Sequence, residues 1–371
     1  MKYRVTCLTP TLVGDGQKLA PIDYMVWKDH VNVLDQRRIF RLLAKGPRLD
    51  SYLEQLKKAD RLDFEAWGGF AQNYAGRRIP FEHASSIPVW QRQHAEDLFI
   101  PTFATNLNGP YLPGTALKGA LRSGSVFDRW TEKTIHDLAE HMEDRVPRYF
   151  SSRAEAAVLG GSGSSRMRRV AVADSDTVAY AGMKVYLLRT ATLMEPKKEV
   201  KGTEPLQLGW KSQRGSVEAR RVDEASAWFA EMAAPGTVFD GIWRERGEGD
   251  RAKAFAASNR YAEAQLARHR EYAERTGMKA LSATLEQLSS RLQAAQQSDR
   301  ACLLSIGWGG GLVGKSAYLN SEDESYRKIM RQMPLYQRAI QTGMPFPKTR
   351  RVIFEGNQPA SLPGWVMLEV G

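Results

Sequence analysis

The sequence has only two cysteines, Cys7 and Cys302, and both lie far apart in apolar, strand-like surroundings. Their number and separation argue against a disulfide framework and against a thiolate metal site. The chain also has no apolar run close to the roughly 20 residues that a bilayer-spanning helix needs. Its first residues, MKYRVTCLTP, enter a strand pattern at once, so we expect no signal peptide. These absences favour a cytoplasmic protein with no membrane partner.

Acidic residues are also in short supply. The 371 residues include 53 Lys and Arg against 42 Asp and Glu, which gives a formal charge of +11. Clustered basic side chains gain free energy by displacing counterions from phosphates, so a polyanion is the favoured partner. With 42% hydrophobic residues the chain can bury a core, which excludes wholesale disorder. Its length suits two domains, or one large fold with insertions.

Strand patterns recur along the whole chain. Short segments rich in β-branched and aromatic residues, bounded by turn residues, predict strands. We expect them at residues 3–8, 31–34, 87–103, 170–178, 183–192, 216–222, 237–243, 302–306 and 366–370.

Helical patterns lie between these strands and predict an α+β fold. Asp35 is placed to cap a helix over 37–44, and further helices are expected at 115–144 and 324–341. Two helical insertions are expected at 47–76 and 250–298, the second a hairpin divided at Gly277. The chain then divides into two strand–helix–strand halves, residues 1–170 and 171–371.

The segment YLPGTALKGALR, residues 111–122, combines a turn with a basic helix. Gly114 follows a proline in the turn, and Thr115 is placed to cap the helix. Lys118 and Arg122 are four residues apart and therefore share one helix face. Gly114 and Gly119 permit close approach, so the segment predicts a phosphate contact. The alternative is a solvated cationic face.

A glycine-rich segment, GWGGGLVGKS, follows the strand expected at 302–306. Gly309, Gly314, Lys315 and Ser316 satisfy the formal P-loop pattern of nucleotide-binding enzymes. Few residues follow Ser316, and they contain neither a convincing helix start nor an apolar strand ending in Asp. The second interpretation is a loop whose bare amides and single lysine let a nucleic-acid backbone approach closely. It assigns this contact to Gly309, Gly310, Gly311 and Lys315.

Two further segments are strongly basic. The flexible run GGSGSSRMRR, residues 160–169, and the run PKTRR, residues 347–351, are expected to be loops that line a phosphate groove, or else solvated loops. Their candidate RNA-binding residues are Arg166, Arg168, Arg169, Lys348, Arg350 and Arg351.

Residues suited to metal or acid–base chemistry are few. His136 and His141 are five apart, not the four that would align two ligands on one helix face. Asp174 and Asp176 favour capping or turn roles, although a metal-dependent ribonuclease would also use carboxylates. We expect no metal and no cofactor. Three tryptophans, for which core positions are favoured over base stacking, are Trp210, Trp308 and Trp365.

These motifs together resemble the RAMP superfamily of CRISPR-associated RNA-binding proteins. The segment YLPGTALKGALR is similar to the turn-and-helix signature of that superfamily, and GWGGGLVGK is similar to its glycine loop. The opening LTPTLVGDGQKLAPIDY and the closing FPKTRRVIFEGNQPASLPGWVMLEV resemble one subunit type. This is the type III-A (Csm) subunit that caps the filament at the 3′ side of the CRISPR RNA.

The resemblance implies a modified RNA-recognition-motif, ferredoxin-like fold, with two such halves. It implies an RNA-binding structural subunit, without catalysis of its own, that supports CRISPR RNA maturation and antiviral defence. Its partners would be CRISPR RNA, backbone RAMP subunits and recruited host nucleases. The target-cleaving aspartate of backbone subunits has no convincing match, with Asp15 and Asp23 the nearest. The alternatives are a metal-dependent endoribonuclease and a sibling RAMP subunit of another type III complex.

Overall fold

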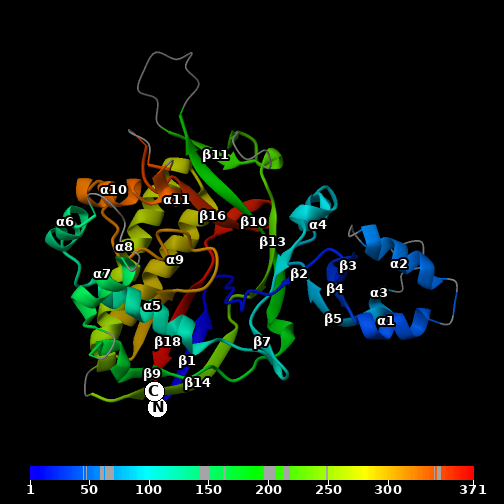
Figure 1. The fold of residues 1–371 in the computed structure, drawn as a ribbon, viewed down its shortest axis with the longest axis horizontal. Helices are drawn as coiled ribbons and strands as arrows, with labels where there is room; N and C mark the ends of the chain where they lie inside the picture. The colour runs from blue at the N-terminus through cyan, green and yellow to red at the C-terminus, as the bar shows by residue number, and fades with distance from the viewer. Residues whose placement is uncertain are drawn as a thin grey trace.

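Two antiparallel sheets form the body of the protein in the computed structural model (Figure 1). The structure describes the whole chain except residues 45, 47, 59–61, 63–70, 143–149, 162–163, 196–205, 213–217, 248–249, 338 and 341–343.

The first sheet has the N-terminal strand at its centre, between two strands from the second half of the chain. The two chain ends therefore lie side by side (Figure 1). This sheet takes strands from both sides of residue 170, and the division of the chain there stays a prediction. Its order is β15 (Ala301–Ser305), β18 (Trp365–Val370), β1 (Lys2–Cys7), β14 (Val238–Glu245) and β9 (Val170–Val172).

The second sheet is organised around the long strand β10 (Met183–Met194). Two strands share one of its edges, each over a different part of its length. Along the path β12–β11–β10–β16–β17, with β13 also on β10, the partners are β12 (Glu218–Ala219), β11 (Gln207–Lys211), β16 (Thr349–Glu355), β17 (Gln358–Ser361) and β13 (Trp228–Ala233).

A helical hairpin packs on both sheets. Its arms are α8 (Asp250–Thr276) and α9 (Lys279–Gln296), and Gly277 makes the turn with a φ of 66°. Helix α5 (Gly114–Phe127) lies against α8 and the first sheet. On β1, Tyr3, Val5 and Cys7 are buried, so the strand's alternation places its apolar face in the core.

A smaller unit projects from the body, at the right of Figure 1. Asp35 caps its first helix by accepting a hydrogen bond from the Arg38 backbone N–H at 3.0 Å, as the sequence predicts. The unit has its own apolar core around Ile39 and Tyr52. Its elements are β3 (Tyr24–Trp27), β4 (His30–Leu34), β5 (Ala75–Pro80), α1 (Gln36–Leu43), α2 (Arg48–Lys58) and α3 (Ala71–Tyr74).

Short elements complete the described chain. They are β2 (Lys18–Leu19) paired with β6 (Ile100–Pro101), β7 (Thr105–Asn106) paired with β8 (Gly109–Pro110), and the helices α4 (Ser86–Gln91), α6 (Glu132–Glu140), α7 (Phe150–Leu159), α10 (Glu324–Arg331) and α11 (Pro334–Gln337). None of the helices in the described ranges has the length and apolar character needed to cross a membrane.

Four expected elements differ from the structure. Of the strand predicted at 216–222, residues 216–217 lie outside the described residues, β12 covers Glu218–Ala219, and Val222 begins a short 3-10 helix. The strand predicted at 87–103 is wrong except for β6: the segment begins with α4, whose Ile87 and Trp90 are one helical turn apart and pack on the main core. The strand predicted at 170–178 ends at Val172, because the following backbone bonds to Leu112 and Asp240 instead. The loop predicted at 347–351 is wrong for its last three residues, because β16 begins at Thr349.

Candidate nucleic-acid interface

The N-terminus of α5 is held by a residue distant in sequence. Pro113 occupies the cap position, and Thr115 lies exposed in the first turn, so the predicted Thr115 cap is wrong. The backbone N–H of Gly114 instead donates to Asp174 Oδ1 at 2.8 Å. A Cβ at Gly114 would lie 2.4 Å from the Val172 carbonyl oxygen, so the close approach of α5 to β9 here requires glycine.

The basic residues of α5 share one side of the helix, as predicted. Lys118 is half-buried and Arg122 is exposed. Together with Thr115 and Gly119 they line a cavity of about 490 Å³ between α5 and α7. Arg122 Nε lies 3.1 Å from Glu155 Oε1, which partly neutralises the entrance.

The glycine loop after β15 is pinned to the segment that follows β1. The Trp308 backbone N–H donates to the Leu12 carbonyl oxygen at 2.7 Å. Gly307 has a φ of 74°, and a Cβ there would lie 2.1 Å from the same oxygen. Gly309 and Gly311 also have positive φ. Glycine therefore lets the loop fold back against its neighbour and leaves backbone close to the surface.

The glycine loop is not built as a P-loop. The strand before it, β15, is antiparallel to its neighbour β18, and residues 311–323 form turns rather than a helix. The Ser316 hydroxyl donates to the Tyr318 carbonyl oxygen at 2.7 Å, so it serves the loop's own conformation. The nucleotide-binding interpretation of this segment is wrong.

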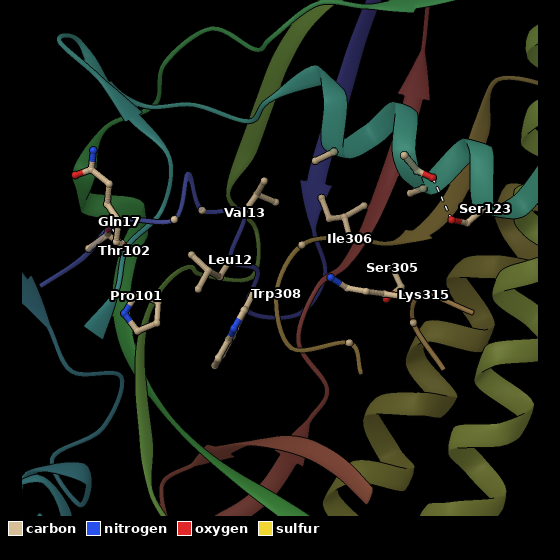
Figure 2. A pocket seen from close by; sticks show the side chains of 18 of the residues that line it. Leu12, Val13, Gln17, Pro101, Thr102, Ser123, Ser305, Ile306, Trp308 and Lys315 are labelled. Atoms are coloured by element: carbon tan, nitrogen blue, oxygen red, sulfur yellow. Dashed lines mark hydrogen bonds between the residues drawn. The ribbon is translucent and has the colours of Figure 1, made fainter. Parts of the chain in front are cut away.

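A cavity of about 740 Å³ separates α5 from the glycine loop (Figure 2). Lys315 is exposed and points into this space, below α5. Gly119 and Arg122 line this cavity and the one beside α7, so the two adjoin across α5. We call the two cavities together the α5 groove. The segment 12–18, which sequence reasoning did not select, forms its third wall through Leu12, Val13, Gly14, Gly16, Gln17 and Lys18.

Arg351 meets the glycine loop through an aromatic contact. Its guanidinium carbon lies 4.1 Å from the ring centroid of Trp308 and 5.8 Å from that of Trp228. Burial lowers the pKa of Arg351, and its buried Nε has no hydrogen-bond partner among the described residues. Trp228 is 44% exposed and lies outside every strand and every site expected from the sequence. Trp210 and Trp365 belong to the core, as predicted.

Those of the other predicted basic residues whose side chains are described do not line the α5 groove. Lys348 Nζ is 2.9 Å from Glu218 Oε1, and Arg169 Nη1 is 3.9 Å from Asp250 Oδ1. Arg350 is buried in β16, so its expected place in a surface loop is wrong. Arg168 is exposed and follows Met167, which lines the cavity between α5 and α7. The side chain of Arg166 lies outside the described part of the structure.

Of the two aspartates suggested for metal chemistry, Asp174 has a structural contact through its carboxylate and Asp176 has one through its backbone. Asp174 holds α5, and the Asp176 backbone N–H donates to the Asp240 carbonyl oxygen at 2.8 Å. His136 Nε2 lies 3.2 Å from Glu140, and His141 Nδ1 lies 2.6 Å from the Asp137 carbonyl oxygen. Within the described ranges no three His, Cys, Asp or Glu side chains gather as metal ligands would.

The α5 turn, and the glycine loop as far as Val313, fall within a match to the family model described as the RAMP superfamily, over residues 4–313. The chain belongs to the RAMP superfamily. Comparison with curated proteins finds no match.

Two solved structures resemble this RAMP protein along its whole length. One is a chain in a cryo-EM structure of a Csm–crRNA–target RNA ternary complex of a type III-A CRISPR–Cas system, with 17% identity, a TM-score of 0.67 and complete coverage of both chains. The other is the crystal structure of T. onnurineus Csm5, with 17% identity and a TM-score of 0.61, covering 98% of this chain and 99% of that one. The predicted α+β RAMP fold is confirmed.

Proposed function

We propose that this RAMP protein is an RNA-binding subunit of a type III-A (Csm) effector complex that holds the CRISPR RNA backbone in the α5 groove. The observation that carries the proposal is the convergence of Lys118, Arg122 and Lys315 on one groove with a glycine-lined wall. Side-chain cations and exposed backbone amides are the groups that phosphates accept hydrogen bonds from. The end-to-end likeness to Csm5 supports this choice over a sibling RAMP subunit.

The finer role in this proposal is that of a cap at the 3′ side of the CRISPR RNA. It would contact a backbone RAMP subunit, support RNA maturation by recruited host nucleases, and work in the cytoplasm. The role in this proposal is binding rather than cleavage. Of the two carboxylates that the ribonuclease alternative would use, Asp174 already holds the first turn of α5.

The first test is purification of the tagged protein from its native cells, with sequencing of the bound RNA and identification of bound proteins. We expect uniform, repeat-derived guide RNAs together with the other subunits. Absence of both would contradict the proposal. Magnesium-dependent RNA cleavage by the purified chain, lost in Asp174→Ala or Asp176→Ala, would favour the endoribonuclease alternative instead.

Charge reversal then tests the α5 groove itself. The double variant Lys118→Glu/Arg122→Glu should bind single-stranded RNA on the order of thirtyfold more weakly, at roughly 1 kcal/mol for each of the two lost charged contacts. The slope of log affinity against log salt concentration should become less negative by about 1.4, since each phosphate contact contributes about −0.7. The matched control is Lys279→Glu/Arg291→Glu, which makes the same charge change on the exposed side of α9. Equal losses in the two double variants would show that net charge, and not the groove, governs binding.

A further inference from the structure

Arg350 is a buried cation without a carboxylate partner. Its side chain extends inward from β16 and is 8% exposed. Nε donates to His269 Nδ1 at 3.1 Å, and Nη1 donates to the carbonyl oxygens of Pro347 and Thr349, both at 2.8 Å. Its guanidinium carbon lies 4.6 Å from the ring centroid of Tyr272. No carboxylate of the described residues forms an ion pair with it.

The charge of Arg350 persists despite burial. Desolvation lowers its pKa to about 10, which still leaves the guanidinium protonated at neutral pH. His269 accepts its hydrogen bond as a neutral imidazole, because burial and the neighbouring Arg350 lower the pKa of His269 well below 6.5. The hydrogen-bond acceptors of Arg350 are neutral and orient the guanidinium, while the Glu271 carboxylate attracts it without forming an ion pair. Buried charges are ordinarily paired, so this one calls for an anion.

Arg350 faces a cavity of about 500 Å³ that is rich in other arginines. The walls are the last turns of α8, helix α10, and the segment 344–347 before β16. We call this cavity the Arg350 pocket. Its remaining charged residues are Arg268, Arg275, Arg327, Arg331, Glu271, Glu322 and Glu324.

Two of the three glutamates of the Arg350 pocket pair with its peripheral arginines, and Glu322 accepts a hydrogen bond from the Ser321 hydroxyl at 3.3 Å. Glu271 pairs with both Arg268, at 3.5 Å, and Arg275, at 2.6 Å. Glu324 lies 3.8 Å from Arg331. These carboxylates thus offset positive charge of the arginines at the rim of the pocket, while the positive charge of Arg350 remains at its base. An anion that enters would pass the rim arginines to reach Arg350, and could draw Arg268 and Arg275 away from Glu271.

Helix α8 connects the Arg350 pocket to the glycine loop. Gln265 Nε2 donates to the Val313 carbonyl oxygen at 2.8 Å, and the Tyr261 hydroxyl donates to the Ser316 carbonyl oxygen at 2.7 Å. Arg268, the first pocket residue on α8, follows Gln265 by less than one helical turn. The glycine loop and the Arg350 pocket therefore adjoin successive parts of α8. The other side of the glycine loop forms the α5 groove.

We propose that the Arg350 pocket binds a phosphate group of RNA, as a site separate from the α5 groove. A phosphate presents several acceptor oxygens, which suits a cluster of guanidinium forks better than a single lysine would. That the phosphate belongs to RNA rests on the proposed function. That an anion binds there rests on Arg350 alone, so the two parts are tested separately.

Inorganic phosphate tests the site without RNA. Phosphate at constant ionic strength and pH, compared with chloride, should raise the Tm of the whole protein. The surface variant Arg268→Gln/Arg275→Gln should need at least threefold more phosphate for the same rise, and Arg350→Gln should show none. Glu271→Gln should need less phosphate, because it frees both rim arginines. The groove variant Lys118→Glu/Arg122→Glu should respond like the wild type. An unchanged phosphate response in Arg268→Gln/Arg275→Gln would overturn the site even if Arg350→Gln fails to fold.

A single-stranded oligoribonucleotide tests the source of the phosphate. In phosphate-free buffer, Arg268→Gln/Arg275→Gln should lower RNA affinity three- to tenfold relative to Lys279→Gln/Arg291→Gln. If the variant loses the phosphate response but keeps full RNA affinity, the pocket binds a small phosphate compound and the RNA assignment is overturned. Competition by poly-glutamate, with no competition by RNA, would assign the pocket to an acidic peptide instead. If the groove variant loses RNA binding but keeps the phosphate response, the α5 groove is the part of the protein that holds RNA in this assay, and the Arg350 pocket still binds an anion.

Discussion

Asp174 Oδ1 accepts a hydrogen bond from the backbone N–H of Gly114 at 2.8 Å, and so fixes the start of α5 from the segment after β9. The first N–H groups of a helix have no partner within the helix, and an acceptor at that end also interacts favourably with the helix dipole. Because α5 carries Lys118 and Arg122, this one bond orients the basic face toward the α5 groove.

Removal of the Asp174 carboxylate should destabilise the protein, because it removes the acceptor at the start of α5. Asp174→Ala should lower the free energy of unfolding by about 1 kcal/mol, the usual cost of a lost helix-cap acceptor. Asp174→Asn keeps an acceptor oxygen and should lower it by less. Denaturant titration of the three proteins measures both values. A stability of Asp174→Ala equal to that of the wild type would show that the bond contributes nothing.

The projecting unit is joined to the body by a buried ion pair. Arg77 on β5 makes two hydrogen bonds to Glu231 on β13, the longer of them 2.9 Å, and the Glu231 side chain is fully buried. Arg77→Ala should therefore destabilise the protein by about 3 kcal/mol, since it leaves a carboxylate buried without its partner. Thermal unfolding compared with Arg78→Ala, an exposed neighbour on the same strand, provides the check. A Tm drop equal to that of the control would mean that the pair is not needed. Arg77→Met/Glu231→Leu should recover much of the loss.

The sequence is sufficient for elements whose signals are local. Asp35 caps α1, Gly277 divides α8 from α9, and the turn at Pro113 starts α5, because each of these effects acts within one helical turn of chain. The common side of Lys118 and Arg122 also follows from helical spacing alone.

Long-range contacts account for what the sequence does not predict. The cap of α5 comes from Asp174 rather than Thr115, the third wall of the groove comes from segment 12–18, and Arg350 leaves the surface for the core. A basic run such as PKTRR carries no mark of which arginine will pack beneath a helix. That choice depends on β16 pairing with β10, a contact between segments distant in the chain.

Stability should decline as the pH falls below about 6.5 because of His269. Burial and Arg350 lower the pKa of His269 in the folded state, whereas the unfolded chain binds a proton with the ordinary pKa. The unfolded state therefore binds more protons at low pH and is favoured there. Between pH 7.5 and pH 5.5 this group should cost about 1 kcal/mol of stability. Denaturant titrations at the two pH values measure the change. His269→Asn, which keeps an acceptor for Arg350, should lose correspondingly less, and an identical change in both proteins would contradict the assignment.

Filling the α5 groove without altering its charge should weaken RNA binding. Gly119 lines both cavities of the groove, and a Cβ there would have no atom within 4 Å. Gly119→Ala should raise the free energy of unfolding by up to about 1 kcal/mol, since alanine favours a helix interior over glycine. Gly119→Phe should also fold, but its ring should occupy the space where the backbone phosphates would pass. RNA affinity should therefore fall on the order of tenfold. Gln293→Phe on the exposed side of α9, outside both cavities, is the matched control. Binding titrations at one salt concentration compare them. Full affinity in Gly119→Phe would place the RNA elsewhere on the protein.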